Sequence, residues 1–234
     1  MTTHQTTHPT TTYHLAGDST VAPMKPLESP MSGWGHFLGR HLGSPVRNHA
    51  FGGATTASFR ASGSWAQVLD DVTPGDTVVI QFGHNDQKLP ELDARGGYTD
   101  RLRTMVAEVR DRGATAVLCT SCERRWFDAS GHVTPTHGDY PNAVRDLARE
   151  LDAPLIDLTV FTTWLYEDLG DAASVALLSH FAPGETAAWP AGLVDDTHFR
   201  AEGADRIAAF VARSLRAIAR RDGDQPAKGS QLVH

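Results

Sequence analysis

The sequence contains only two cysteines, Cys119 and Cys122, among 234 residues. Two cysteines are too few for a disulfide framework, which agrees with a reducing compartment. No run approaches the roughly 18 apolar residues that a membrane-spanning helix needs. The N-terminal stretch MTTHQTTHPTTTY has neither the basic nor the apolar region of a secretory signal. We therefore expect a cytoplasmic protein that has no membrane partner.

An excess of basic residues is also missing, since 21 Lys and Arg stand against 28 Asp and Glu, for a net charge of −7. The basic residues are scattered among acids, which argues against a nucleic-acid partner. The twelve histidines are scattered as well, with His4, His8 and His14 in or beside the N-terminal tail. Because no Cys/His cluster has the spacing of a metal site, we predict no metal and no cofactor.

Hydrophobic residues make up 40% and charged residues 21% of the chain, as in ordinary globular proteins. A chain of this length fits one domain. We predict a disordered Thr/His-rich tail over residues 1–11, a single domain over 12–220 and a flexible tail over 221–234.

Short apolar runs alternate with amphipathic segments along the chain, which is typical of repeated βα units around a parallel sheet. Strands are predicted at 13–17, 46–51, 77–83, 115–120 and 154–158. Helices are predicted at 34–43, 64–71, 98–113, 140–151 and 159–169, with a last helix that carries the apolar stripe Ile207, Phe210, Val211, Leu215 and Ile218. The pattern predicts an α/β fold, a three-layer α/β/α sandwich, whose ligand edge lies beyond the carboxyl ends of the strands.

Two turns follow the first two predicted strands. In GDST, Ser19 comes directly after the first strand, where a sharp turn can expose a hydroxyl and a backbone N–H, although Ser and Asp are also common turn and cap residues. Gly52 and Gly53 follow the second strand. Glycine lets a backbone N–H approach a ligand closely, or simply makes a turn with positive φ.

Two further segments end at the same predicted edge. Asn85, in QFGHNDQK, can donate its amide hydrogens to a developing oxyanion or close an Asx turn. Asp195 and His198 lie three residues apart just before the last helix, so the carboxylate can hold the imidazole Nδ1–H and leave Nε2 as a base. The alternative there is a helix cap made by Asp196 or Thr197.

Taken together, these segments supply a nucleophile, a base, a carboxylate that orients the base, and donors for an oxyanion. Hydrolysis of an ester through a covalent intermediate needs these parts. The sequence therefore favours an esterase.

The blocks GDST, GG, GHND and DDTH resemble the four blocks of the SGNH (GDSL-type) hydrolase superfamily. The longer stretches GWGHFL, AFGGATTASF, VVIQFGHNDQK and VDDTHFRAEGADRIA resemble its rhamnogalacturonan acetylesterase group. This resemblance implies a flavodoxin-like, parallel five-stranded sheet, with Ser19 as nucleophile, His198 as general base and acid, and Asp195 as its orienter. It also implies an oxyanion hole of the Ser19 and Gly53 N–H groups and the Asn85 amide.

The resemblance further implies removal of O-acetyl groups from carbohydrate, of the pectic rhamnogalacturonan type or related to it. Where this group often has Arg after the glycine pair and again three residues later, the chain has Ala54 and Ala57. Cationic contacts to an acidic sugar are therefore absent at these positions. We expect a small acetylated carbohydrate as substrate and a monomer or homodimer as the assembly.

Polar neighbours of these residues are expected to support the site or touch the substrate. Asp18 is expected to fix the turn at Ser19, and His84 and Asp86 to line the pocket or support the amide between them. Arg124 and Arg125 are expected to brace the active-site loops or to contact a substrate carboxylate.

Three tryptophans, Trp34, Trp126 and Trp189, fall near predicted strand ends. Sugars stack on exposed aromatic rings, but a single tryptophan is more often part of the core. Of the three, Trp189 is included among the possible substrate residues.

Other interpretations compete with the esterase. CTSC at 119–122 has the spacing of a redox pair, although it falls in the fourth strand and lacks a helix start after it. A non-catalytic flavodoxin-like binding domain would use GDST as an anion-binding turn, and would leave Asn85 and the Asp195/His198 pair without a purpose. A broad short-chain esterase or lipase of the same superfamily, acting on xylan-type or small acetylated metabolites, is the third alternative.

Overall fold

In the computed structural model, which describes residues 11–224, a parallel five-stranded sheet has the order β3-β1-β4-β5-β6. Its strands are β1 (Tyr13–Gly17), β3 (Val46–Asn48), β4 (Thr77–Gln81), β5 (Thr115–Cys119) and β6 (Leu155–Ile156). All five predicted strands are confirmed, and so is the flavodoxin-like order. In this order β3 lies on one side of β1, and the later strands β4, β5 and β6 are added on the other side.

The sheet is apolar on both faces, as a buried parallel sheet must be. Along β1, Leu15 packs on one face and Ala16 on the other, and along β5 Val117 and Leu118 do the same. Burying one such aliphatic side chain stabilises the fold by about 1.5–3 kcal/mol. The sheet therefore forms the rigid base from which the site loops project.

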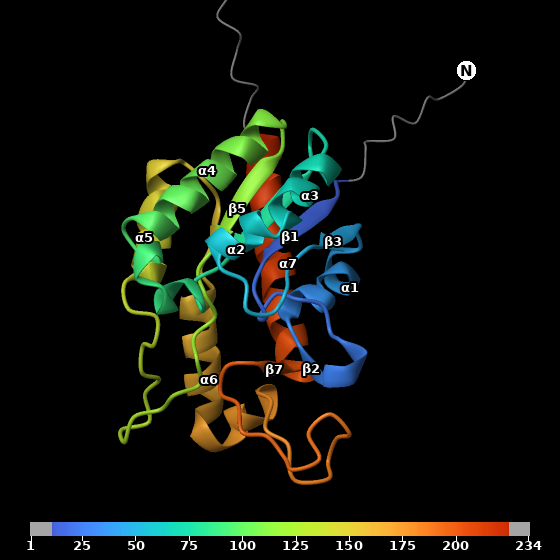
Figure 1. The fold of residues 1–234 in the computed structure, drawn as a ribbon, viewed down its shortest axis with the longest axis vertical. Helices are drawn as coiled ribbons and strands as arrows, with labels where there is room; N and C mark the ends of the chain where they lie inside the picture. Colours follow the sequence, from blue (N-terminus) through green and yellow to red (C-terminus); the bar gives the residue numbers. More distant parts are fainter. Residues whose placement is uncertain (1–10, 225–234) are drawn as a thin grey trace, which may run out of the picture.

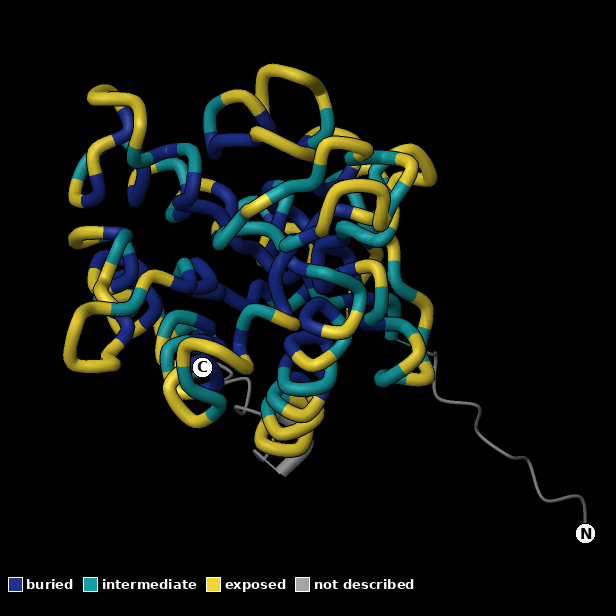
Figure 2. The backbone as a smooth tube through the Cα atoms, turned by 90° about the horizontal axis from the view of Figure 1, so that it is seen from below, coloured by how far each residue is buried: buried dark blue, intermediate teal, exposed yellow. Residues whose placement is uncertain are grey.

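Helices cover both faces and complete the three layers (Figure 1). Side chains of α1 (Leu38–Leu42), α6 (Leu158–Ser174) and α7 (Ala201–Asp224) pack on one face. The other face is covered by α2 (Thr56–Ala61), α3 (Ser64–Asp71), α4 (Gly97–Asp111) and α5 (Tyr140–Glu150). Figure 2 shows the buried backbone at the centre and the exposed backbone on the outer turns.

Several boundaries differ from the prediction. β3 ends at Asn48, although the N–H groups of His49 and Phe51 still donate to β1 carbonyls, so the predicted run to residue 51 remains paired. The predicted helix 34–43 is a 3₁₀ turn, η2 (Trp34–His36), followed by α1. The predicted helix 159–169 starts one residue earlier and continues to Ser174, across a kink at Gly170 where φ is 75°.

Helix α2 was not predicted because it has only six residues and no repeating apolar stripe. A capping box defines it instead: the Thr55 side chain accepts from the Ser58 N–H, and the Ser58 side chain accepts from the Thr55 N–H. This helix starts three residues after Gly53, so its cap fixes the end of the loop that holds the glycine pair.

Strands β2 (Met31–Ser32) and β7 (Phe199–Arg200) were also not predicted. They pair antiparallel at one end of the molecule (Figure 1). The remaining short elements are the 3₁₀ turns η1 (Pro26–Glu28), η3 (Asp86–Lys88), η4 (Pro90–Leu92) and η5 (Val175–Leu177). Two-residue strands have no periodicity and could not be predicted. The β2/β7 ribbon nevertheless joins the segment after Ser19 to the segment that ends at His198.

The predicted C-terminal boundary needs a correction, because helix α7 continues to Asp224 and the boundary at residue 220 falls inside it. His14, beside the predicted N-terminal tail, lies fully buried in β1 as the strand prediction for 13–17 implies, with Nε2 3.4 Å from Asp76 Oδ2. His4 and His8, and residues 1–10 and 225–234 of the predicted tails, lie outside the described residues.

Within residues 11–224, no helix has both the length and the apolar character needed to cross a membrane. The same residues include no group of three or more His, Cys, Asp or Glu side chains placed to hold a metal ion.

Candidate active site

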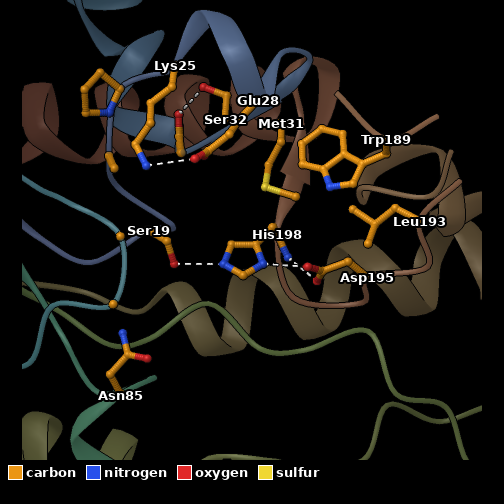
Figure 3. Close-up of a pocket in the computed structure, with 15 residues that line it drawn as sticks. Ser19, Lys25, Glu28, Met31, Ser32, Asn85, Trp189, Leu193, Asp195 and His198 are labelled. Carbon is orange, nitrogen blue, oxygen red and sulfur yellow. Dashed lines mark hydrogen bonds and ion pairs between the residues drawn. The ribbon is translucent and has the colours of Figure 1, made fainter. Parts of the chain in front are cut away.

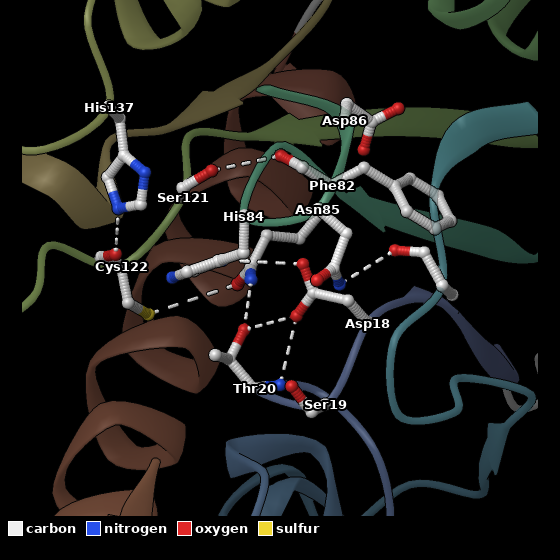
Figure 4. A network of polar contacts seen from close by, with 12 residues as sticks. Asp18, Ser19, Thr20, Phe82, His84, Asn85, Asp86, Ser121, Cys122 and His137 are labelled. Atoms are coloured by element: carbon white, nitrogen blue, oxygen red, sulfur yellow. Dashed lines mark hydrogen bonds and ion pairs between the residues drawn. The ribbon is translucent and has the colours of Figure 1, made fainter. Parts of the chain in front are cut away.

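Ser19 lies in the turn that follows β1, and the buried Asp18 holds that turn. Asp18 Oδ1 accepts hydrogen bonds from the N–H and hydroxyl of Thr20, at 2.9 and 2.8 Å (Figure 4). Burial alone would raise the pKa of Asp18, but His84 and the Thr20 hydrogen bonds outweigh it and hold that pKa below its usual value. The carboxylate therefore stays ionised and keeps the turn in one shape.

His198 links Ser19 to Asp195. Its Nε2 lies 2.9 Å from Ser19 Oγ, and its Nδ1 lies 2.7 Å from Asp195 Oδ2 (Figure 3). When Nδ1–H donates a hydrogen bond to the carboxylate, Nε2 carries no proton and is free to accept the serine proton. Residues 179 positions apart in sequence thus meet. Ser19 follows β1, whereas His198 directly precedes β7, which pairs with β2 in the loop region after Ser19.

Asp195 is held in place by the backbone. Its Oδ1 accepts from the N–H groups of Thr197 and His198, at 2.8 and 2.9 Å. Burial raises the pKa of Asp195, but the hydrogen bond and charge of His198 and these two N–H groups outweigh it, so the pKa lies below its usual value. Asp195 is therefore ionised and able to orient the imidazole.

Three donors stand beside Ser19. Within residues 11–224, neither the backbone N–H of Ser19 nor that of Gly53 donates to a protein acceptor. Gly53 has a φ of 77°, a conformation that a side chain would strain. Asn85 donates one Nδ2 hydrogen to the Ala54 carbonyl at 3.1 Å, which leaves its other Nδ2 hydrogen available to a ligand.

A cavity of about 480 Å³ opens over these groups. Besides the predicted catalytic and oxyanion residues and Trp189, it is lined by Ala22, Pro23, Lys25, Glu28, Met31, Ser32, Gly33, Gly52 and Leu193. Figure 3 shows Trp189, Met31 and Leu193 on one side of His198 and Asn85 on the other. Of the predicted sugar platforms, only Trp189 lies here; Trp34 is fully buried and Trp126 is not among the lining residues.

Sequence reasoning missed Lys25, Glu28, Met31, Ser32 and Leu193. Met31 and Ser32 form β2, and Lys25 and Glu28 lie at the 3₁₀ turn η1 just before it. So short a ribbon has no periodicity from which it could be predicted. Lys25 Nζ lies 2.9 Å from Glu28 Oε1 at the rim, so the two charges largely cancel there.

His84 and Asp86 support the site from behind rather than lining it. His84 Nδ1 lies 3.3 Å from Asp18 Oδ2. Asp86 Oδ1 accepts from the N–H and hydroxyl of Thr56, at 2.8 and 2.6 Å, and so ties the loop after β4 to the start of α2. Burial raises the pKa of Asp86.

The sequence matches the model of the GDSL-like lipase/acylhydrolase family over residues 15–206. The chain belongs to this family. Rhamnogalacturonan acetylesterase RhgT of Bacillus subtilis is 43% identical over 203 residues, which cover 86% of this chain and 88% of RhgT. A rhamnogalacturonan acetylesterase of Emericella nidulans is 39% identical over 224 residues, covering 86% of this chain and 83% of that protein.

Solved structures agree with the fold of this GDSL-like hydrolase. The crystal structure of Bacillus subtilis YxiM superimposes with a TM-score of 0.76 at 27% identity, over 90% of this chain and 57% of that chain. A catalytic mutant of an acetylxylan esterase from Geobacillus stearothermophilus gives 0.58 at 16% identity, over 88% of this chain and 94% of that chain. At such low identity, the second likeness shows the fold alone. Membership of a hydrolase family removes the basis for a non-catalytic flavodoxin-like domain.

In this GDSL-like chain, Arg125 braces the loop that carries Asp195 and His198. The buried guanidinium donates to Asp196 Oδ1 at 2.7 Å, and the Arg125 N–H donates to the Asp196 carbonyl at 2.9 Å. His180 Nε2 also lies 2.8 Å from Asp196 Oδ1. The predicted bracing role fits Arg125, whereas Arg124 is half-buried and donates to Thr136 Oγ1 at 3.1 Å.

The two cysteines of this GDSL-like chain are free and buried. Burial raises the pKa of both thiols, which keeps them protonated and unreactive at neutral pH. Cys119 is part of the core and Cys122 lies in the loop after β5, so the redox interpretation of CTSC finds no support.

Behind the site, the buried His137 makes stability depend on pH. Burial, with the charges of His84 and Arg124, lowers the pKa of His137 to about 3. Below about pH 6.5 the unfolded chain binds a proton there that the folded protein does not, so the free energy of unfolding falls as the pH falls toward 3. We expect His137→Gln to make this dependence shallower by up to about 1 kcal/mol per pH unit between pH 4 and 6.

Urea unfolding of both proteins across this pH range measures the effect. The buried His14 and His49, whose pKa values burial also lowers, are the same in both proteins and cancel in the comparison. Parallel pH profiles for the two proteins would contradict the assignment.

Proposed function

We propose that the protein is a serine esterase that removes O-acetyl groups from carbohydrates through an acetyl-enzyme. The observation that carries this proposal is the unbroken series of contacts from Asp195 through His198 to Ser19, which ends in a cavity that Gly53 and Asn85 also line. The relatives RhgT and the Emericella nidulans protein are rhamnogalacturonan acetylesterases, which supports an acetylated sugar as the substrate class.

In the first half of the reaction, Ser19 Oγ attacks the acetyl carbonyl while His198 Nε2 takes the serine proton. The carbonyl oxygen becomes negative and is held by the N–H groups of Ser19 and Gly53 and by Asn85 Nδ2. His198 then gives its proton to the sugar oxygen, the bond from carbon to that oxygen breaks, and the alcohol leaves. Asp195 stabilises the imidazolium in between.

In the second half, a water molecule attacks the acetyl-enzyme. His198 accepts a proton from this water, the tetrahedral intermediate forms against the same three donors, and the proton returns to Ser19 Oγ as acetate leaves. The cycle consumes one ester and one water and yields one alcohol and one acetic acid. No step needs a metal or an organic cofactor.

Trp189 is proposed as the platform for the sugar ring. Its ring stacks on Phe181 at 5.1 Å between centroids and 11° between planes, and the Arg200 guanidinium covers Phe181 at 4.5 Å. The contact with Phe181, which Arg200 also contacts, holds the Trp189 ring at the wall of the cavity. The apolar face of a pyranose packs well against such a ring.

We expect Trp189→Ala to raise KM for a sugar acetate by about tenfold, the loss of one aromatic stacking contact. Trp189→Phe should keep most of the affinity. The measurement compares acetate release from an acetylated sugar and from ethyl acetate, which has no ring to stack. An equal loss on both substrates would show that Trp189 supports the loop and does not bind sugar.

Acetate release from acetylated rhamnogalacturonan oligosaccharides, acetylxylan and simple sugar acetates tests the proposed function and its substrate. Ala54 and Ala57 offer no charge to an acidic sugar, so neutral acetylated oligosaccharides of the xylan type are the second candidate. If the protein releases acetate from none of these sugar acetates, the proposal of a carbohydrate esterase is refuted.

For the location we propose the cytoplasm, supported by two buried cysteines that remain unpaired. For the assembly we propose a monomer or homodimer.

A further inference from the structure

The loop after β4 places a lysine against the amide of Asn85. Asn85 is the N-cap of the 3₁₀ turn η3, which ends at Lys88. Side chains three residues apart on a 3₁₀ turn lie directly above one another. Lys88 Nζ accordingly donates to Asn85 Oδ1 at 2.8 Å, and the Lys88 backbone N–H donates to the Asn85 carbonyl at 3.1 Å.

The Asn85 amide is therefore held at both ends. Its Oδ1 accepts from the Lys88 ammonium, and one Nδ2 hydrogen goes to the Ala54 carbonyl at 3.1 Å. Turning the amide over would place Oδ1 against the Ala54 carbonyl and Nδ2 against the ammonium, so both contacts oppose it. The second Nδ2 hydrogen is then directed to the cavity, where Asn85 is a lining residue.

We propose that Lys88 is a positioning residue that holds and polarises the oxyanion-binding amide of Asn85. This inference rests on the proposed function, in which Asn85 Nδ2 binds the oxyanion. A charged donor on an amide oxygen draws electron density from the nitrogen, which makes the remaining N–H a stronger donor. The gain appears when negative charge develops on the carbonyl oxygen, so Lys88 acts on kcat.

Lys88 is exposed at the surface, so solvent screens its charge and the expected effect is smaller than that of Asn85 itself. We expect Lys88→Met to lower kcat on p-nitrophenyl acetate by about fivefold to tenfold, which is less than a buried hydrogen bond to a charged group would contribute, because solvent screens the ammonium. KM should change little. Lys88→Arg keeps a cationic donor within reach and should restore most of kcat.

The sharpest test is a double-mutant cycle with Asn85→Ala. That variant alone should lose about 10²- to 10³-fold in kcat. Because Lys88 acts through Asn85, Lys88→Met in the Asn85→Ala background should cost no further activity. The same loss in both backgrounds, or no loss in the wild-type background, would overturn the proposal.

The ester separates this role from substrate binding. p-Nitrophenyl acetate carries no carboxylate. If Lys88 only attracted an acidic sugar, Lys88→Met would leave the turnover of this ester unchanged and would raise KM for uronic acid acetates alone. That result would also overturn the proposal. If the wild-type protein turns over p-nitrophenyl acetate in a Ser19-dependent way while Lys88→Met is fully active, only the role of Lys88 fails. An absence of wild-type turnover would contradict the proposed function itself.

Discussion

Replacing Ser19 by Ala is expected to lower kcat on acetyl esters by at least about 10⁴-fold, as loss of the nucleophile does in other serine hydrolases. The variant should fold normally, because Ser19 is only half-buried and the turn is held by Asp18 and Thr20. Its KM for any residual turnover should remain close to the wild-type value, since the cavity keeps its walls. Acetate release and circular dichroism on the same preparation measure both expectations.

Ser214→Ala is the matched control for this variant. Its hydroxyl is also half-buried, but it donates to the Phe210 carbonyl at 3.1 Å within α7 and does not line the cavity. We expect it to keep full activity. A Ser19→Ala protein that retains a tenth or more of wild-type turnover would exclude Ser19 as the nucleophile.

Replacing His198 by Ala should cost about as much as Ser19→Ala, because the hydroxyl is a weak nucleophile when no base takes its proton. The two residues act as one unit, so the double variant should be no slower than either single variant. Added imidazole should restore part of the activity of His198→Ala and none of that of Ser19→Ala. Asp195→Ala should be milder, since it removes the orienter and leaves the base.

His132→Ala serves as the control for the histidine variant, because His132 is exposed and lies outside the cavity. It should behave as the wild type. Losses that multiply in the double variant would show that Ser19 and His198 act independently and would contradict the shared mechanism.

The position of the main site residues could be predicted because parallel strands bring their carboxyl ends to one edge. Ser19 and Asn85 follow β1 and β4, which pair in register from Tyr13 with Thr77 to Gly17 with Gln81. Asp195 and His198 could be paired from their spacing alone. Local sequence was sufficient in both cases because each residue depends on its own strand or turn.

The walls of the cavity could not be predicted in this way. Met31 and Ser32 reach the pocket through pairing with β7, which lies far along the chain, and a two-residue strand has no pattern of its own. The position of the Trp189 ring depends on its stacking against Phe181, a contact between two residues of the same long loop. The contact between Lys88 and Asn85 depends on the 3₁₀ turn in HNDQK, because side chains three residues apart are eclipsed in such a turn. The contact could therefore be predicted only together with that turn.

The most direct test of the account is whether acetate passes through Ser19. The protein is mixed with excess p-nitrophenyl acetate, quenched in acid within the first turnover, digested and analysed by mass spectrometry. We predict an acetyl group on the peptide that contains Ser19, in an amount that decays as acetate is released, and none on this peptide in Ser19→Ala. Steady hydrolysis with no acetyl group on Ser19 at any time, or acetylation of another residue at the rate of turnover, would contradict the account.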